Sequence, residues 1–328
     1  MKKFLSNVFK FISLAVGLYL ILLVASQQLL PPAYVKNITY VPGGNGHLYT
    51  RLNEADTTKN IDVLILGSSH AYRGYDTRKF RLNGLRAFNL GSSSQTPIQT
   101  ELLFNEYIDQ FNPQLVIFDI YPVLLGSDGV ESTIDILSNQ TLNIKTASLA
   151  LGSRNIKVYN AFLLDMLFEG LGKETTEPEL KPNGDKYVAG GYIETSQDHV
   201  KKERKQRTKR YIVDRKQLEA VTNIVASLKK RNIPYMLIQA PVRNDVYSAV
   251  TNNSEMDSIL QKFGTYYNFN KRIFLSDHEF LDASHLNQRG VDIFNKHVLS
   301  IVAEKLGSAI SNDQKATSIL KVTSHSTE

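Results

Sequence analysis

A short apolar run at residues 61–66 constrains the fold more than any other feature of the chain. It reads Ile-Asp-Val-Leu-Ile-Leu and ends abruptly at the small residues Gly67-Ser68-Ser69. Large aliphatic side chains at consecutive positions face both sides of a strand, so both faces of this strand must be covered. Coverage on both faces is typical of a parallel strand inside a layered α/β fold.

Similar strand signals alternate with helical ones along the rest of the chain. The other expected strands are apolar runs at residues 86–90, 115–121, 234–240 and, less clearly, 272–275. The expected helices show apolar residues at helical spacing over 97–111, after a capping Asp214, and over 291–306. This alternation predicts an α/β protein with a central parallel sheet.

Residues 1–30 have the composition of a membrane segment. Lys2, Lys3 and Lys10 precede a run from Phe11 to Leu30 without a charged residue. About twenty helical residues span roughly 30 Å, the thickness of the hydrocarbon layer. The lysines favour an N-terminus inside the cell, so we expect a single-pass anchor in the cytoplasmic membrane and an extracytoplasmic main domain. Small residues at 24–26 leave a cleaved signal sequence as the alternative.

Composition gives the remaining organisation. Residues 31–60 contain proline and glycine clusters and are expected to form an extracytoplasmic linker. The main domain is expected at 61–310, with an insertion at about 123–210 that has helical character over 148–171. The polar tail at 311–328 is expected to be disordered.

The chain contains no cysteine, which excludes disulfides, thiolate metal sites and a cysteine nucleophile. Export without disulfides suits a bacterial envelope protein. A formal net charge of +6 is mild, and no nucleic-acid-binding motif is present. We therefore expect no nucleic acid, cofactor or metal as a partner.

Two short motifs carry side chains suited to nucleophilic catalysis. Ser68 and Ser69 follow the first expected strand, and ligands bind beyond the carboxyl ends of parallel strands. Far downstream, Asp282-Ala283-Ser284-His285 precedes the last expected helix. An acid three residues before a histidine can hold its Nδ1 proton and leave Nε2 to accept one from a hydroxyl. The spacing does not separate Ser68 from Ser69, and each motif alone also fits an ordinary turn.

Together these residues resemble the SGNH/GDSL hydrolase superfamily, which has serine after its first strand, glycine after its second and D-x-x-H before its final helix. The resemblance implies a three-layer α/β/α, flavodoxin-like SGNH fold. It also implies that Ser69 is the nucleophile and that His285, oriented by Asp282, is the base. The N–H groups of Ser69 and Gly91 would then form the oxyanion hole.

The glycine-serine-serine form and the N-terminal segment are similar to one envelope branch of this superfamily. That branch includes the D-alanyl lipoteichoic acid transfer protein and alginate acetyltransferase-like proteins, and the resemblance covers roughly residues 61–122 and 230–306. One block departs from the family. The third strand usually ends in G-x-N-D, whose asparagine donates to the oxyanion, whereas this chain reads Phe118-Asp119-Ile120-Tyr121-Pro122. Tyr121 or a backbone group would have to replace that donor, and Asp119 is expected to be structural.

Other polar residues near strand ends are candidates for contact with substrate, with a solvated loop as the alternative for Arg73, Gln95 and Arg243. The full set is His70, Arg73, Gln95, Tyr121 and Arg243. The basic run at 201–210 is a candidate for contact with an anionic glycan or lipid headgroup, against a solvated linker.

These features predict an exported, membrane-anchored serine esterase or O-acyltransferase. By resemblance to the envelope branch, its substrate would be an acylated cell-surface glycan or small ester, and a polytopic membrane acyltransferase would be a partner. The alternative is a non-catalytic envelope polysaccharide assembly or binding protein with a degenerate site. A nucleotide-binding protein is disfavoured, because no glycine-rich phosphate loop follows the first strand.

Overall fold

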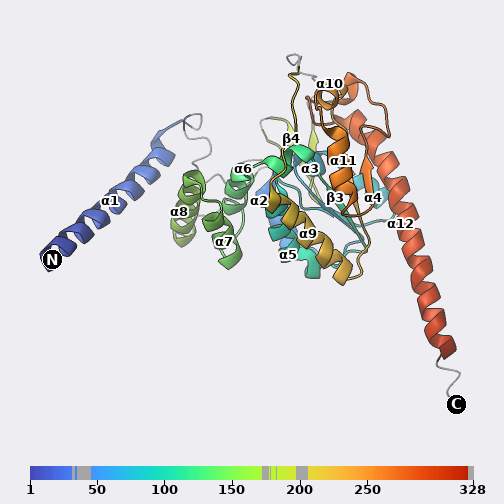
Figure 1. The fold of residues 1–328 in the computed structure, drawn as a ribbon, viewed down its shortest axis with the longest axis horizontal. Coiled ribbons are helices and arrows are strands. Elements are labelled where there is room, and N and C mark those ends of the chain that lie inside the picture. Colours follow the sequence, from blue (N-terminus) through green and yellow to red (C-terminus); the bar gives the residue numbers. More distant parts are fainter. Residues whose placement is uncertain are drawn as a thin grey trace.

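The computed structural model describes residues 1–31, 34, 46–171, 177, 179–181, 183–196 and 206–323, with side chains described up to residue 307. A five-stranded parallel sheet forms its centre (Figure 1). Across the sheet the strands are β2 (Ala87–Asn89), β1 (Val63–Leu66), β3 (Leu115–Asp119), β6 (Tyr235–Gln239) and β7 (Tyr266–Asn268). This order reverses direction beside β1, as in flavodoxin-like folds, and it confirms the predicted α/β class with a central parallel sheet.

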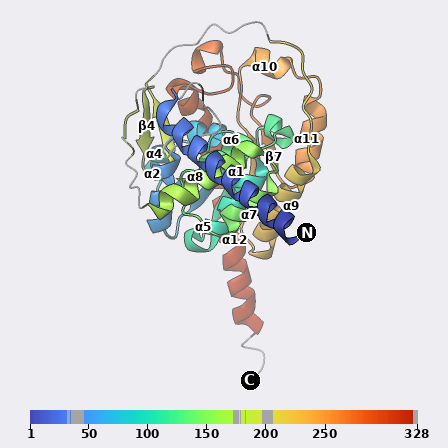
Figure 2. The ribbon, with the colours of Figure 1, turned by 90° about the vertical axis from the view of Figure 1, so that its left-hand side faces the viewer.

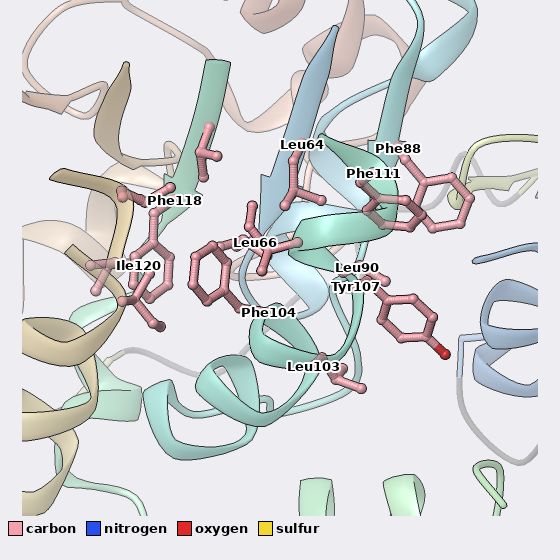
Figure 3. Close-up of a cluster of buried hydrophobic side chains, with 14 of the residues drawn as sticks. Leu64, Leu66, Phe88, Leu90, Leu103, Phe104, Tyr107, Phe111, Phe118 and Ile120 are labelled. Atoms are coloured by element: carbon pink, nitrogen blue, oxygen red, sulfur yellow. The ribbon is translucent and has the colours of Figure 1, made fainter. Parts of the chain in front are cut away.

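The central strands have apolar residues on both sides because each face of the sheet carries helices. Leu64 and Leu66 of β1 pack with α5 (Pro97–Phe111), α9 (Arg215–Lys230) and α2 (Leu48–Thr57). Figure 3 shows this cluster, with Phe104 and Phe111 of α5 reaching the sheet. The predicted bounds of α5 are confirmed, and Asp214 caps α9 by accepting a hydrogen bond from the Lys216 N–H.

The opposite face packs against the final helix and the short helices that follow β1. Val63 and Ile65 of β1 contact residues of α12 (Gln288–Thr323), α3 (Ser69–Gly74) and α4 (Thr77–Leu82). Two short helices, α10 (Asn244–Ser248) and α11 (Asn253–Gln261), connect β6 to β7, and the 3-10 turn η2 (Asp277–Glu279) precedes α12. The result is three layers with the carboxyl ends of the strands along one edge.

The segment after β3 leaves the sheet, as the predicted insertion required. It contains the 3-10 turn η1 (Pro122–Gly126), helices α6 (Val130–Leu137), α7 (Ile144–Gly152) and α8 (Ile156–Gly170), and the hairpin of β4 (Asp185–Val188) and β5 (Tyr192–Thr195). The hairpin covers the outer strand of the sheet, because the Asn89 N–H donates to the Gly190 carbonyl at 2.8 Å. The expected helix at 148–171 is interrupted at Asn155, whose side chain caps α8.

The apolar N-terminal segment forms helix α1 (Lys2–Leu29), which projects away from the sheet (Figure 1). By length and composition it can cross a membrane. Its C-terminal part lies against α8.

Three sequence expectations about local structure are corrected. Residues 48–57 are not linker but helix α2, because Leu48, Leu52 and Ala55 pack into the core at helical spacing. The last strand is 266–268 rather than 272–275, since an edge strand with polar tyrosine tips gives a weaker apolar signal. The tail was expected to be disordered, but helix α12 continues through Thr323. Its first turns pack on the sheet and nucleate the helix, and extending a nucleated helix is easier than starting one. Most of the remaining linker and residues 201–205 of the basic run lie outside the described residues.

Candidate active site

Ser69 occupies the first position of α3, directly after β1. Gly67 makes this tight turn possible, because its φ is +144° and a Cβ there would lie 2.6 Å from the Asp119 carbonyl oxygen. The Ser68 hydroxyl accepts a hydrogen bond from the His70 N–H at 3.3 Å, so Ser68 is the N-cap of the helix. The two serines that the sequence could not separate therefore have different surroundings: Ser68 is buried in the turn, and Ser69 is partly exposed.

The Asp282 carboxylate shapes the turn that carries His285. Its Oδ1 accepts hydrogen bonds from the N–H groups of Ser284 and His285, each at 2.8 Å. Its Oδ2 lies 2.8 Å from His285 Nδ1. Burial opposes the ionised carboxyl, but the hydrogen bonds and charge of His285 prevail and hold the pKa of Asp282 below its usual value. An ionised acid at this place favours an imidazole with its proton on Nδ1.

His285 Nε2 lies 2.9 Å from Ser69 Oγ, which completes a line of contacts from serine to acid. With the proton on Nδ1, Nε2 accepts the serine hydroxyl hydrogen. Two backbone hydrogen bonds also fix this turn: the Leu281 N–H donates to the His285 carbonyl at 2.8 Å, and the Arg243 N–H donates to the Ala283 carbonyl at 3.1 Å. Ser69 thus meets Asp282 and His285, a pair more than 200 positions downstream, at the carboxyl edge of the sheet, in a geometry suited to an activated hydroxyl nucleophile.

Gly91 lies beside the serine turn, as the motif led us to expect. A Cβ at Gly91 would lie 2.6 Å from the Ser68 carbonyl oxygen, so no other residue fits without movement. Its N–H, however, donates to Asn89 Oδ1 at 2.9 Å, and Asn89 Nδ2 donates to the Ala71 carbonyl at 2.7 Å. The expected oxyanion donor is therefore already paired in this structure. An asparagine two residues before a glycine is a turn signal that identifies this acceptor in retrospect.

The Ser69 N–H is the other expected oxyanion donor. It belongs to the first turn of α3, where backbone N–H groups have no acceptor within the helix. The asparagine that the family supplies from the third block has no counterpart, because β3 is followed by Ile120 and Tyr121. The site thus offers fewer fixed donors for a developing oxyanion than the family pattern implies.

His70 and Tyr121 form one wall of the site. The two rings stack with their centroids 4.1 Å apart, and His70 meets the His285 ring edge to face at 5.3 Å. Burial, with a smaller contribution from His285, lowers the pKa of His70 to about 3. A neutral His70 can lie against His285 without opposing a positive charge there. Both residues were candidates for contact with substrate, and both lie at the site.

The remaining candidate residues serve other contacts. Arg73 binds Asp185 through two hydrogen bonds of 2.9 and 2.6 Å, which tie α3 to the hairpin. Arg243 binds Asp245 in the same two-point manner, at 2.7 Å for each bond. The two side chains are 15% and 7% exposed, so neither is in the solvated loop of the alternative, and contact of either residue with substrate stays a prediction.

Gln95 and Asp119 lie behind the serine turn. Gln95 is 2% exposed and donates to Thr100 Oγ1 at 3.0 Å, so it is an internal residue in this structure, and its contact with substrate stays a prediction. Asp119 is also buried and accepts a hydrogen bond from Tyr75 OH at 2.8 Å. Burial raises the pKa of Asp119 to about 7. Its position agrees with the structural role expected for it.

Among the described residues, no group of three or more histidine or acidic side chains is arranged to hold a metal ion. No family model matches the chain, and no curated protein matches it. Solved structures similar to it include a provisionally assigned acylhydrolase from Bacteroides fragilis NCTC 9343, with 13% identity, a TM-score of 0.39 and coverage of 78% of this chain and 95% of that one. A GDSL-like lipase from Bacteroides thetaiotaomicron VPI-5482 has 12% identity, a TM-score of 0.39 and coverage of 80% and 98%. Similarity at this level does not establish a shared activity.

Proposed function

We propose that this chain is a serine esterase or O-acyltransferase that works through an acyl-enzyme on Ser69. The observation that carries the proposal is the line of contacts from Ser69 Oγ to His285 Nε2 at 2.9 Å and from His285 Nδ1 to Asp282 at 2.8 Å. A nucleophile, a base within hydrogen-bond reach and a group that orients the base are the parts that covalent acyl transfer needs.

The reaction proceeds in two halves. Ser69 Oγ attacks the carbonyl carbon of an ester as His285 Nε2 takes the hydroxyl proton, and the imidazolium is stabilised by Asp282. Collapse of the tetrahedral intermediate breaks the ester bond, and His285 returns the proton to the departing alcohol. Water or a second alcohol then attacks the acyl-enzyme with His285 again as base, which frees Ser69 and releases an acid or a new ester.

The oxyanion is the weak part of this mechanism. The Ser69 N–H lies in the first turn of α3, where the helix itself supplies no acceptor, whereas the Gly91 N–H donates to Asn89. Loss of one donor typically lowers the rate on the order of a hundred- to a thousandfold. We therefore expect slow acylation, and faster acylation with substrates whose carbonyl draws the Gly91 N–H away from Asn89.

The proposed location and substrate follow the resemblance to the envelope branch. Helix α1 would anchor the chain in the cytoplasmic membrane with the main domain outside. The substrate would be an acylated cell-surface glycan or a small ester, and a polytopic membrane acyltransferase would supply or receive the acyl group. Both assignments rest on analogy of motif.

A fluorophosphonate probe tests the proposal, because it reacts covalently with activated serines. We expect the full-length protein to be labelled once, on Ser69, and Ser69→Ala to remain unlabelled. Ser68→Ala is the matched control: it removes the neighbouring hydroxyl and a helix cap worth about 1 kcal/mol, but it leaves the nucleophile in place. Absence of labelling in the folded wild-type protein would contradict an activated serine.

A second candidate function has specific support. The missing third-block asparagine and the paired Gly91 N–H both favour a non-catalytic protein that assembles or binds envelope polysaccharide. Under this alternative the folded protein binds an envelope glycan and resists the probe. Labelling of Ser69 together with turnover of an ester would exclude it.

A further inference from the structure

The outer face of α8 is apolar, although nothing in the described part of the chain covers it. A surface helix normally turns its apolar stripe inward, and the inner side of α8 already does so with Val158, Ala161 and Leu164. A second apolar stripe, recurring every three or four positions, faces outward. Its members are Ile156 (62% exposed), Tyr159, Met166, Leu167 and, at the C-cap, Leu171 (77% exposed), while the partly buried Leu163 at its edge packs against the contact with α1.

The exposed charges of α8 lie only near its two ends. Lys157 is exposed in the first turn and Glu169 in the last, and between them the sole charged residue is Asp165, which is 3% exposed. A helix with apolar residues on both its inner and outer faces, and with charges only near its ends, is suited to contact with lipid or another apolar surface rather than with water. The charged side chains of Lys157 and Glu169 can extend to polar groups at the edge of such an apolar environment.

The same helix holds α1. Leu23 of α1 is 6% exposed and packs against Leu164 and Phe168, and the Tyr19 hydroxyl donates a hydrogen bond to Asn160 Oδ1. Figures 1 and 2 both place α8 beside the C-terminal part of α1. The contact therefore lies within the apolar segment, not beyond its end.

The position of this contact sets the depth of α8. Leu23 and Tyr19 lie six and ten residues before the end of α1 at Leu29, which a rise of about 1.5 Å per residue converts to about 9 and 15 Å. Amphipathic helices that lie in a membrane surface bury their apolar face roughly 5–10 Å into the headgroup and acyl boundary. If α1 spans the bilayer up to Leu29, these contacts place α8 in the outer part of the hydrocarbon layer and at its outer boundary.

We propose that α8 is a membrane-surface helix, with its outward stripe embedded in the outer boundary of the lipid bilayer. This inference rests on the membrane anchoring of α1 in the proposed function. The bilayer, rather than a second protein, is the occupant because the stripe continues directly from the contact with the apolar helix. Together α1 and α8 would hold the main domain against the membrane at a fixed height.

The absence of native cysteine allows a direct test with single labels. Full-length Leu167→Cys and Leu171→Cys carry a fluorophore and are placed in vesicles of phosphatidylcholine and phosphatidylglycerol, some with a nitroxide on the acyl chain. Phe274→Cys is the matched control, since Phe274 is 89% exposed on the main domain. Leu18→Cys, in the middle of α1, reports the anchor itself.

We expect severalfold stronger quenching by nitroxide lipid than by aqueous iodide at Leu167 and Leu171, and the reverse at Phe274. Iodide quenching at Leu167 and Leu171 equal to that at Phe274 would overturn the α8 proposal. So would protection from both quenchers in native membranes, which would indicate a protein occupant. Lipid quenching at position 18 but not at 167 or 171 would overturn the α8 proposal and leave the membrane anchor supported. Absence of lipid quenching at position 18 would contradict the proposed anchoring of α1.

Discussion

Asp282→Asn gives the sharpest test of how the site prepares its base. In the wild-type protein one carboxylate oxygen accepts from the N–H groups of Ser284 and His285, and the other lies 2.8 Å from His285 Nδ1. An asparagine at this position has one acceptor oxygen, and two backbone donors fix it on their side. Its NH2 group then faces Nδ1, which can only accept.

The consequence is a histidine in the wrong tautomer. With Nδ1 as acceptor, the proton resides on Nε2 and points at Ser69 Oγ, so the base is blocked. A triad with this defect elsewhere lost activity by about 10⁴, which corresponds to about 5.5 kcal/mol in the barrier. The turn itself keeps both backbone hydrogen bonds, so the free energy of unfolding should fall by only about 1 kcal/mol.

The assay is the second-order rate of fluorophosphonate labelling, measured beside urea unfolding. We expect Asp282→Asn to lose three to four orders of magnitude in labelling rate, about 4–5.5 kcal/mol, while it stays folded. Asp282→Ala is the comparison, because it removes the acceptor for both backbone donors and should also destabilise the turn. A labelling rate of Asp282→Asn within threefold of wild type would refute the tautomer argument.

Three further predictions concern the surroundings of the site. Gly91→Ala would place a Cβ 2.6 Å from a backbone carbonyl oxygen, so it should lower the free energy of unfolding by about 1–3 kcal/mol and abolish most of the fluorophosphonate labelling. Gly152→Ala is the control: no atom lies within 4 Å of the added Cβ, so stability and labelling should both stay close to wild type. Burial raises the pKa of Asp119 to about 7, so its stabilising contribution is complete below its unfolded pKa of about 3.9 and is lost as pH rises through 7. Urea unfolding of Asp119→Asn, compared with wild type, should therefore show a relative gain in the free energy of unfolding of roughly 4 kcal/mol between pH 4 and 8. A difference that stays constant with pH would contradict the burial argument. Arg73→Met loses both hydrogen bonds to Asp185, so the free energy of unfolding should fall by about 2–4 kcal/mol while fluorophosphonate labelling persists. Loss of labelling in a folded variant would instead place Arg73 at the substrate.

Much of the fold was predictable because burial leaves a plain signal in parallel strands. The runs that became β1, β3 and β6 are apolar at most positions, and α5 and α9 show apolar residues at helical spacing with a proline or aspartate at the start. Helix α2 was not predicted because few of its residues are apolar and its buried Arg51 reads as a surface residue. The edge strand β7 was misplaced because its tyrosines are only partly buried.

The sequence predicted the contacts among Ser69, His285 and Asp282, but not the hydrogen-bond partners of the residues around them. A small turn after a strand and an acid three residues before a histidine leave clear patterns, whereas hydrogen-bond partners depend on the final packing. The partner of Arg73 is Asp185, which lies in the separate hairpin, and the acceptor of the Gly91 N–H is a side chain two residues earlier. The Arg73 pairing does not follow from spacing along the chain, whereas the Asn89 pairing is the two-residue pattern of a turn and is recognisable once the fold is known.

Intact-mass analysis of the acyl-enzyme tests the central claim most directly. The full-length protein is mixed with p-nitrophenyl acetate, quenched with acid within the first turnover and weighed, and the modified peptide is sequenced by fragmentation. The account predicts one added acetyl group per chain, located on Ser69, and none on Ser69→Ala. A folded protein that releases p-nitrophenol with no acetyl on Ser69, or with the acetyl on another residue, would contradict it.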